Sequence, residues 1–98
     1  MERLTKKTEN GSYAFEAAAE ELASALGHYE DLLEGIEAER ELVQLNLDAL
    51  KADGKAKSAT YTMLMGSRYM LDEMLSRASE PPEETSGRLE NLRKLLKD

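Results

Sequence analysis

The chain has 98 residues, of which 41% are hydrophobic, 5% aromatic and 34% charged, and it carries a formal net charge of −7 with no cysteine. This composition excludes disulfides, zinc–thiolate sites and thiol catalysis, and it is too hydrophobic for a disordered acidic tail. A single small domain with a core of Leu, Ala, Met and Ile fits these values, and such a core is typical of helical proteins.

The first twelve residues, 1–12, are polar and mildly basic, and they end near the turn signal Asn10-Gly11. They lack the apolar run of a signal peptide, and no later stretch approaches the roughly 18 apolar residues of a membrane span. We therefore expect a soluble, cytoplasmic protein without membrane contact.

Residues 13–53 show the strongest pattern, which predicts one long helix capped at its start by Ser12. Two rows of residues recur at intervals of seven, as the two core positions of a heptad do. Gly27 and Gly35 interrupt the helix and indicate either a bend or a close helix approach, while Asp53-Gly54 ends it. The two rows are Phe15, Leu22, Tyr29, Ile36, Val43 and Leu50, and Ala19, Leu26, Leu33, Arg40 and Leu47.

A second helix is predicted from Ser58 or Thr60 to about Ser79, and a short third helix from about Thr85 or Ser86. Between them, Pro81 and Pro82 interrupt the helical pattern. The third helix has Leu89, Leu92 and Leu96 on one face. The apolar face of the second helix consists of Met63, Leu64, Met70, Leu71, Met74, Leu75 and Ala78.

These elements predict an all-α fold: a long heptad-patterned helix, an antiparallel second helix and a short C-terminal helix. The expected parts are a polar segment 1–12, a helical hairpin 13–79, and a linker with a short helix over 80–98. The second helix reaches only about Leu32 to Leu50, so either the third helix or another subunit must cover the rest of the stripe. Because an isolated short helix is marginal, we favour a homo-oligomer. Its expected contact is formed by Phe15, Leu22, Leu26 and Tyr29.

No catalytic, metal or cofactor site is predicted. The lone His28 has no partner at the spacing that helical metal bundles use, so it is interpreted as a surface or interface histidine. No Ser/His/Asp set and no glycine-rich phosphate loop is supported. We therefore expect a protein that is not an enzyme.

Two surfaces are candidates for binding a partner. Met65 projects with Tyr61, Tyr69 and Asp72 away from the core face of the second helix, and Tyr/Met clusters are typical of adaptable binding surfaces. The alternative is that a second subunit or the third helix buries this cluster.

The second surface is an acidic ridge, because residues 12–50 contain ten acidic residues and one basic residue. Such a surface repels nucleic-acid phosphates, so we expect no direct binding of duplex DNA and favour a protein partner with a basic surface. The ridge is interpreted either as a solvated helix face or as a mimic of a nucleic-acid backbone. It comprises Glu16, Glu20, Glu30, Glu34, Glu37 and Glu41.

Three stretches carry a resemblance. The start MERLTKKTENGSYAF and the segment YEDLLEGI resemble small accessory proteins of phages and prophages of Gram-positive bacteria. The stretch LKADGKAKSATYTMLM is similar to the second-helix entry of small phage helical-hairpin proteins. The resemblance implies a phage context in a bacterial host, where small acidic proteins, anti-CRISPR proteins among them, act by occupying a host protein.

Three functions follow as hypotheses. The first is a stoichiometric inhibitor of a host defence or nucleic-acid-handling protein. The second is an oligomeric sponge for a cyclic nucleotide, in which Lys51, Lys55, Lys57 and Arg68 would contact phosphate and tyrosines would stack on the base. The third is a structural coiled-coil adaptor.

Overall fold

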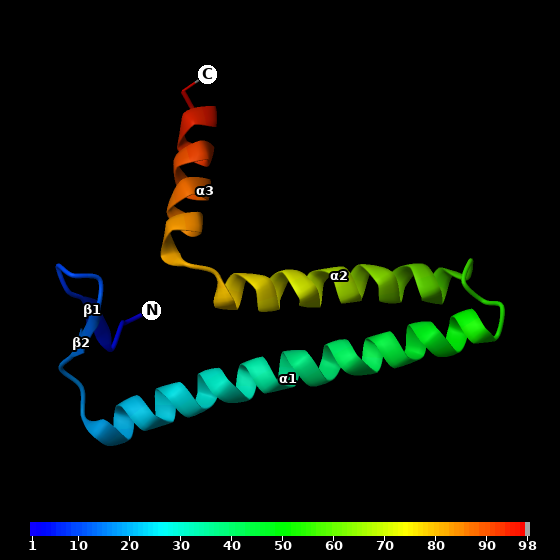
Figure 1. Ribbon diagram of the computed structural model, residues 1–98, viewed down its shortest axis with the longest axis horizontal. Helices are drawn as coiled ribbons and strands as arrows, with labels where there is room; N and C mark the ends of the chain where they lie inside the picture. Colours follow the sequence, from blue (N-terminus) through cyan, green and yellow to red (C-terminus); the bar gives the residue numbers. More distant parts are fainter. Residues whose placement is uncertain (98) are drawn as a thin grey trace. The chain divides into compact units, whose positions relative to one another are not determined.

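The computed structural model of the protein describes residues 1–97 and is mostly helical, as the sequence predicts. In chain order it contains strands β1 (Thr5–Lys7) and β2 (Tyr13–Phe15) and helices α1 (Ala19–Ala52), α2 (Ala59–Ser79) and α3 (Pro82–Leu95) (Figure 1). The chain forms two compact units, Met1–Gly35 and the residues from Ile36 onward, and α1 supplies helical residues to each.

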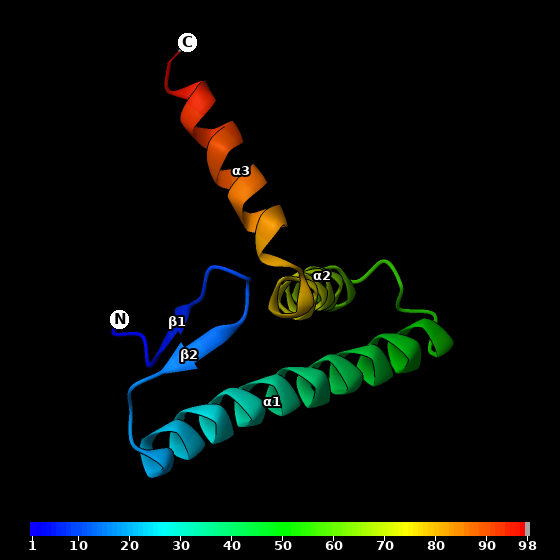
Figure 2. The same ribbon diagram turned by 60° about the vertical axis from the view of Figure 1, so that its left-hand side comes forward.

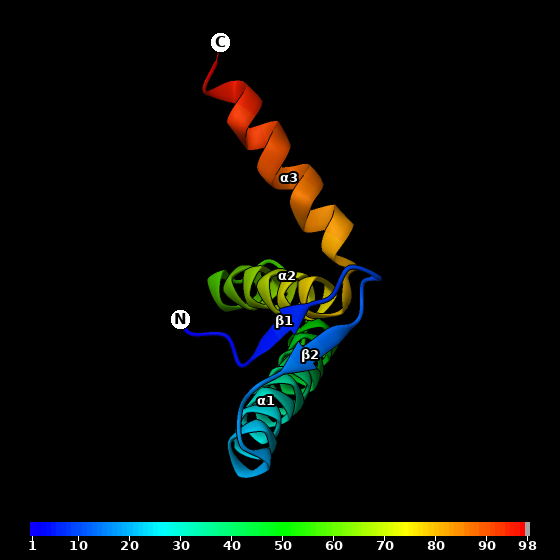
Figure 3. The same cartoon turned by 90° about the vertical axis from the view of Figure 1, so that its left-hand side faces the viewer.

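The N-terminal segment is a β-hairpin, which corrects the prediction that the helix starts at residue 13. Strands β1 and β2 pair antiparallel, with Thr5 opposite Phe15 and Lys7 opposite Tyr13 (Figures 2 and 3). Gly11 takes a positive φ of 85° in the connecting turn, where glycine is favoured because it has no Cβ. Phe15 stands seven residues before Leu22 and so imitates the heptad, although it belongs to a strand.

Helix α1 runs without interruption through Gly27 and Gly35, so neither glycine breaks it. A Cβ atom added at either glycine would meet no atom within 4 Å, so no close approach in the described residues requires them. The helix ends in a Schellman motif, in which Gly54 has a φ of 73° and donates its N–H to the Lys51 carbonyl at 3.1 Å. The Lys55 N–H closes the motif on the Leu50 carbonyl at 2.8 Å.

Helix α2 returns antiparallel along the second part of α1, so the predicted helical hairpin is confirmed (Figure 1). Its start is also confirmed, because the Ser58 hydroxyl accepts the Tyr61 N–H at 3.1 Å as an N-cap. Arg40 contacts Asp72, and Arg68 donates to Gln44 at 2.9 Å. The step from Arg40 to Gln44 along α1 thus corresponds to the step back from Asp72 to Arg68 along α2, and these two pairs define the register of the helical hairpin.

Helix α3 begins at Pro82, three to four residues before the predicted start. The sequence predicts a break over residues 80–84 because of the two prolines. Proline lacks only an N–H that the first helical turn leaves unpaired anyway, so Pro82 is compatible with that turn. The helix therefore starts inside the proline pair.

The buried core of the described residues is small and lies in the helical hairpin, where Leu47 of α1 is 2% exposed and Leu71 of α2 is also buried. The predicted core face of α2 is wrong for its methionines, because Met63, Met70 and Met74 are all exposed. The residues of α2 that are buried or half-buried beside them are Tyr61, Leu64, Ser67, Arg68, Leu71, Asp72 and Leu75. Within residues 1–97 no helix combines the length and the apolar character needed to cross a membrane.

Candidate interaction surfaces

One side of the helical hairpin is a polar network formed by α1 and α2. Asp72 accepts from Arg40 through one carboxylate oxygen and lies 3.8 Å from the Arg68 Nε through the other. Gln44 accepts from Arg68 and donates to Asp48 at 2.9 Å. The prediction that Asp72 projects with the Tyr/Met cluster away from the core face of the second helix is therefore wrong, because Asp72 contacts Arg40 of α1.

The residues of the Tyr/Met cluster differ in their exposure to solvent. Tyr61 is half-buried, whereas Met65 and Tyr69 are exposed, so two of the three predicted contact residues stay open to a partner. The reason lies in the rotation of α2: the antiparallel register brings Tyr61, Arg68 and Asp72 to the α1 side. The sequence offers one signal for this rotation, which is the opposite charges of Arg40 on α1 and Asp72 on α2. A helical wheel drawn for α2 alone does not include a pairing between two helices.

The other side of the helical hairpin is an apolar groove that sequence reasoning did not find. We call it the methionine groove; it has a volume of about 300 Å³ and is lined by Glu39, Val43, Ser67, Met70, Leu71 and Met74. Met70 and Met74 are exposed while Val43 is half-buried, so the groove is open to solvent. Methionine side chains adapt to differently shaped apolar surfaces because they are unbranched and polarizable.

The acidic ridge is exposed along its length. Glu30, Glu34, Glu37 and Glu41 all face solvent, and none of the four forms an ion pair within residues 1–97. Unneutralised carboxylates along one helix produce a negative field that attracts cationic surfaces and decays over about 8 Å at physiological ionic strength.

The N-terminal unit contains a larger apolar pocket of about 950 Å³. Three of the four residues predicted for self-association line it from α1, namely Leu22, Leu26 and Tyr29. Leu4, which precedes β1, and Tyr13 of β2 line the same pocket, whereas Phe15 of β2 is exposed and does not line it. The structure thus brings the helix stripe together with the N-terminal segment, which the sequence treated as a separate polar part.

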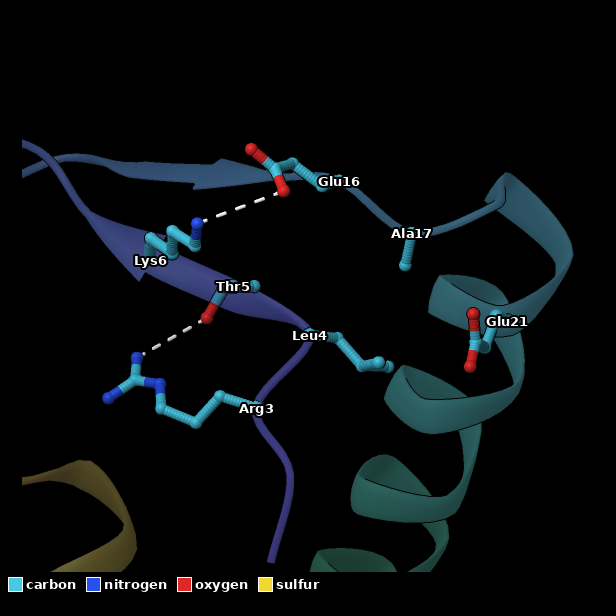
Figure 4. Close-up of a pocket in the computed structure, with 7 residues that line it drawn as sticks. All are labelled: Arg3, Leu4, Thr5, Lys6, Glu16, Ala17 and Glu21. Carbon is cyan, nitrogen blue, oxygen red and sulfur yellow. Dashed lines mark hydrogen bonds and ion pairs between the residues drawn. The ribbon is translucent and has the colours of Figure 1, made fainter.

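A smaller depression beside this pocket shows how the hairpin approaches α1. Leu4 points toward the first turns of α1, while Lys6 reaches across the strands to Glu16 (Figure 4). The Lys6–Glu16 pair is 3.7 Å long and highly exposed, so it contributes little to stability.

Among the described residues, the pKa shifts that are resolved lie at the junction between α2 and α3. Arg88 donates two hydrogen bonds to the half-buried Glu80 carboxylate, one of them at 3.2 Å. The Arg88 guanidinium lowers the pKa of Glu80 below its usual value, with a second contribution from the Thr85 hydroxyl at 3.0 Å. The same contact raises the pKa of Arg88. Both groups are charged at neutral pH, so the pair is a salt bridge between the C-cap of α2 and helix α3.

His28 is exposed on α1, as expected for a surface histidine. In the part of the chain that the structure describes, no group of three or more His, Asp or Glu side chains could hold a metal ion.

Comparison of the chain with family models finds no family that matches, and no curated protein or solved structure matches it either.

Proposed function

We propose that this protein is a non-enzymatic binding module that acts by occupying a partner protein with a basic surface. The observation that carries the proposal is that few of its large apolar side chains are buried and many are exposed. Among the described residues only Leu47 and Leu71 are buried hydrophobic residues, whereas large apolar side chains on every element except β1 are exposed. A chain that leaves this much apolar surface open is suited to bury it against another protein.

The two surface types have separate roles in this proposal. The acidic ridge attracts the partner and sets the association rate, because long-range electrostatics acts on encounter. The methionine groove and the exposed Met65 and Tyr69 make the short-range contacts, which set the dissociation rate. The fitting partner is a host nucleic-acid-handling or defence protein, whose basic groove the ridge would fill. The bacterial-phage context rests on the sequence resemblance alone.

The sponge hypothesis receives no comparable support. Arg68, one of its four proposed phosphate ligands, is already engaged by Gln44 and Asp72 within the helical hairpin. Lys51, Lys55 and Lys57 lie near the turn between α1 and α2, and they line none of the three pockets described above. We therefore propose no cofactor or nucleotide ligand.

We also propose that the protein binds copies of itself. The apolar pocket of the N-terminal unit, lined by Leu22, Leu26 and Tyr29, supports a contact between copies at that end of α1. Sedimentation of the full chain at micromolar concentration tests it. Replacing Leu22 and Leu26 with Gln should shift the chain toward monomer, and a wild-type chain that sediments only as monomer would overturn the proposal.

The test of the binding function is a pull-down from bacterial lysate followed by surface plasmon resonance on the captured protein at two salt concentrations. Replacing Glu30, Glu34, Glu37 and Glu41 with Gln should slow association, and the effect should shrink as salt rises. Met65→Ala with Tyr69→Ala should speed dissociation, as should Met70→Gln with Met74→Gln in the groove.

The outcomes separate the two surfaces. If only the groove variant dissociates faster, the methionine groove is the contact and the Tyr/Met cluster is not. If no protein is captured in near-stoichiometric amount, or if none of the three variants alters binding, the proposed function is wrong.

A further inference from the structure

The second part of α1 has an apolar seam on the face that points away from α2. Successive helical residues are rotated by about 100°, so residues two positions from the buried Leu47 lie on the far side of the helix. Leu45 is one of these and is 57% exposed, and Leu42, one turn before it, is 60% exposed. We call Ala38, Leu42, Leu45 and Ala49 the outer seam; their spacing of four, three and four is the heptad spacing of a helix-packing face.

The outer seam is shaped for a second helix. Its two leucines lie between alanines at 38 and 49, and small residues at the ends of a seam let a neighbouring helix approach closely. No residue of the seam is buried or half-buried, so no described element packs against it. Its length is three helical turns, which a helix of about a dozen residues can cover.

The borders of the outer seam are acidic. Glu37 and Glu41 flank it on one side and Glu39 on the other, and none of them forms an ion pair within the described residues. A helix that docks there needs an apolar stripe with basic side chains beside it. An acidic helix would place like charges against each other at the seam borders.

Helix α3 has this complementary chemistry. Leu89, Leu92 and Leu96 share one face at helical spacing and are exposed. Arg93 and Lys97, four residues apart, border that face, and the segment from Arg88 to Lys97 contains four basic residues and one acidic residue. An amphipathic helix of this length is marginal without a packing partner, so α3 gains from any surface that covers its leucines.

We propose that α3 of one copy docks on the outer seam of a second copy, and that the exchange is reciprocal in a dimer. Leucines of α3 lie between Leu42 and Leu45, while Arg93 and Lys97 face the carboxylates of Glu37 and Glu41. One such helix contact is small, and the reciprocal exchange counts it twice, which brings the total toward the roughly 1,200–2,000 Å² that specific interfaces bury. This dimer goes beyond the proposed binding of a partner protein, and it uses a surface separate from the N-terminal pocket proposed above for self-association.

The experiment measures the mass of the full chain by size-exclusion chromatography with light scattering over a concentration series. Leu42→Gln with Leu45→Gln should weaken the dimer at least about tenfold, since about 1.4 kcal/mol corresponds to a factor of ten and each leucine loses its contact. Leu92→Gln with Leu96→Gln should weaken it similarly. Circular dichroism should show that both variants remain helical, because all four side chains are exposed in the single chain.

A matched control uses an exposed apolar residue that lies in none of the proposed contact surfaces. Met63→Gln removes one side chain of comparable exposure from α2 and should leave the dimer constant unchanged within about twofold. Equal weakening by this control and by the seam variant would show general stickiness of the apolar surface and would overturn the docking site.

A charge exchange identifies the partner surface. Glu37→Lys with Glu41→Lys should weaken the dimer, and so should Arg93→Glu with Lys97→Glu. A mixture of these two variants should restore both helix contacts, one with the wild-type charges and one with the charges exchanged. A wild-type chain that stays monomeric at about 100 µM, a dimer that only Leu22→Gln with Leu26→Gln dissolves, or a mixture without rescue would each overturn the proposal. The lysate pull-down tests the proposed function separately, because a partner protein can be captured whether or not the chain dimerises.

Discussion

In α1 from Ile36 onward, the face toward α2 and the opposite face both carry leucines, but the leucines of the two faces differ in burial. On the face toward α2, Leu47 is 2% exposed and Arg40 pairs with Asp72 across the helical hairpin. On the far face, Leu45 is 57% exposed. Two leucines two residues apart therefore differ almost completely in burial. The comparison shows that hydrophobicity alone does not define the core of this protein, and that the face toward α2 holds the fold while the outer seam is available for association.

Leu47→Asp should have the largest effect. A carboxylate at this position would be buried without a partner and would also remove the central apolar contact, so we expect a loss of about 3 kcal/mol or more. For a chain of this size that is a large part of its stability, and most molecules should unfold. Urea denaturation followed by circular dichroism measures the loss.

The matched change on the far face is Leu45→Asp. Its side chain already faces solvent in the single chain, so the cost should be about 1 kcal/mol or less, mainly from helix propensity. Both variants are compared at dilute concentration, where association does not contribute. Equal midpoints for the two variants would show that the two faces are assigned incorrectly.

Asp72→Asn tests the polar part of the face toward α2. It removes the charge that both Arg40 and Arg68 face, but the pair is partly exposed, so we expect a cost of about 1 kcal/mol. The control is Glu73→Gln, because Glu73 pairs only within α2 with Arg77 at 3.8 Å and should cost about 0.5 kcal/mol or less. If the control costs more, the hairpin register does not depend on the Arg40–Asp72 contact.

Gly35→Ala should stabilise the chain by about 0.5–1 kcal/mol. A Cβ at this position meets no atom within 4 Å and alanine is the better helix former. Gly54→Ala is the contrasting change, because its φ of 73° strains any residue with a Cβ and should destabilise the chain by about 1 kcal/mol. Thermal melts distinguish the two, and a destabilising Gly35→Ala would indicate a bend or contact at that glycine.

The smallest effect concerns the junction of α2 and α3 and depends on pH. The Arg88 contact lowers the pKa of Glu80 below 4.5 in the folded chain, so its contribution is present above the unfolded-state pKa and is lost as pH falls through the folded value. We expect acidification below pH 4.5 to loosen the start of α3. Carbon-detected NMR titration of the Glu80 carboxyl measures the shift, and Glu80→Gln should remove this part of the pH dependence. A Glu80 pKa at or above 4.5 contradicts the pairing.

Much of the local structure could be predicted from the sequence because it depends on neighbouring residues. Ser58 caps α2 through the backbone of Tyr61, and Gly54 ends α1 with a backbone conformation that favours glycine. The heptad positions from Ile36 to Leu50 also predicted the face of α1 that packs on α2, because helical periodicity is a local property.

The tertiary structure decided which apolar side chains are covered. The composition of α2 favours its methionines as core residues, but pairing of Arg40 with Asp72 and of Gln44 with Arg68 rotates α2 so that Met63, Met70 and Met74 remain exposed. At the N-terminus, Phe15 fits the heptad spacing, yet pairing with Thr5 across the turn at Gly11 places it in a strand. Both outcomes depend on contacts between residues that are distant in the chain. The periodicity of a single helix gives no information about the energies of such contacts.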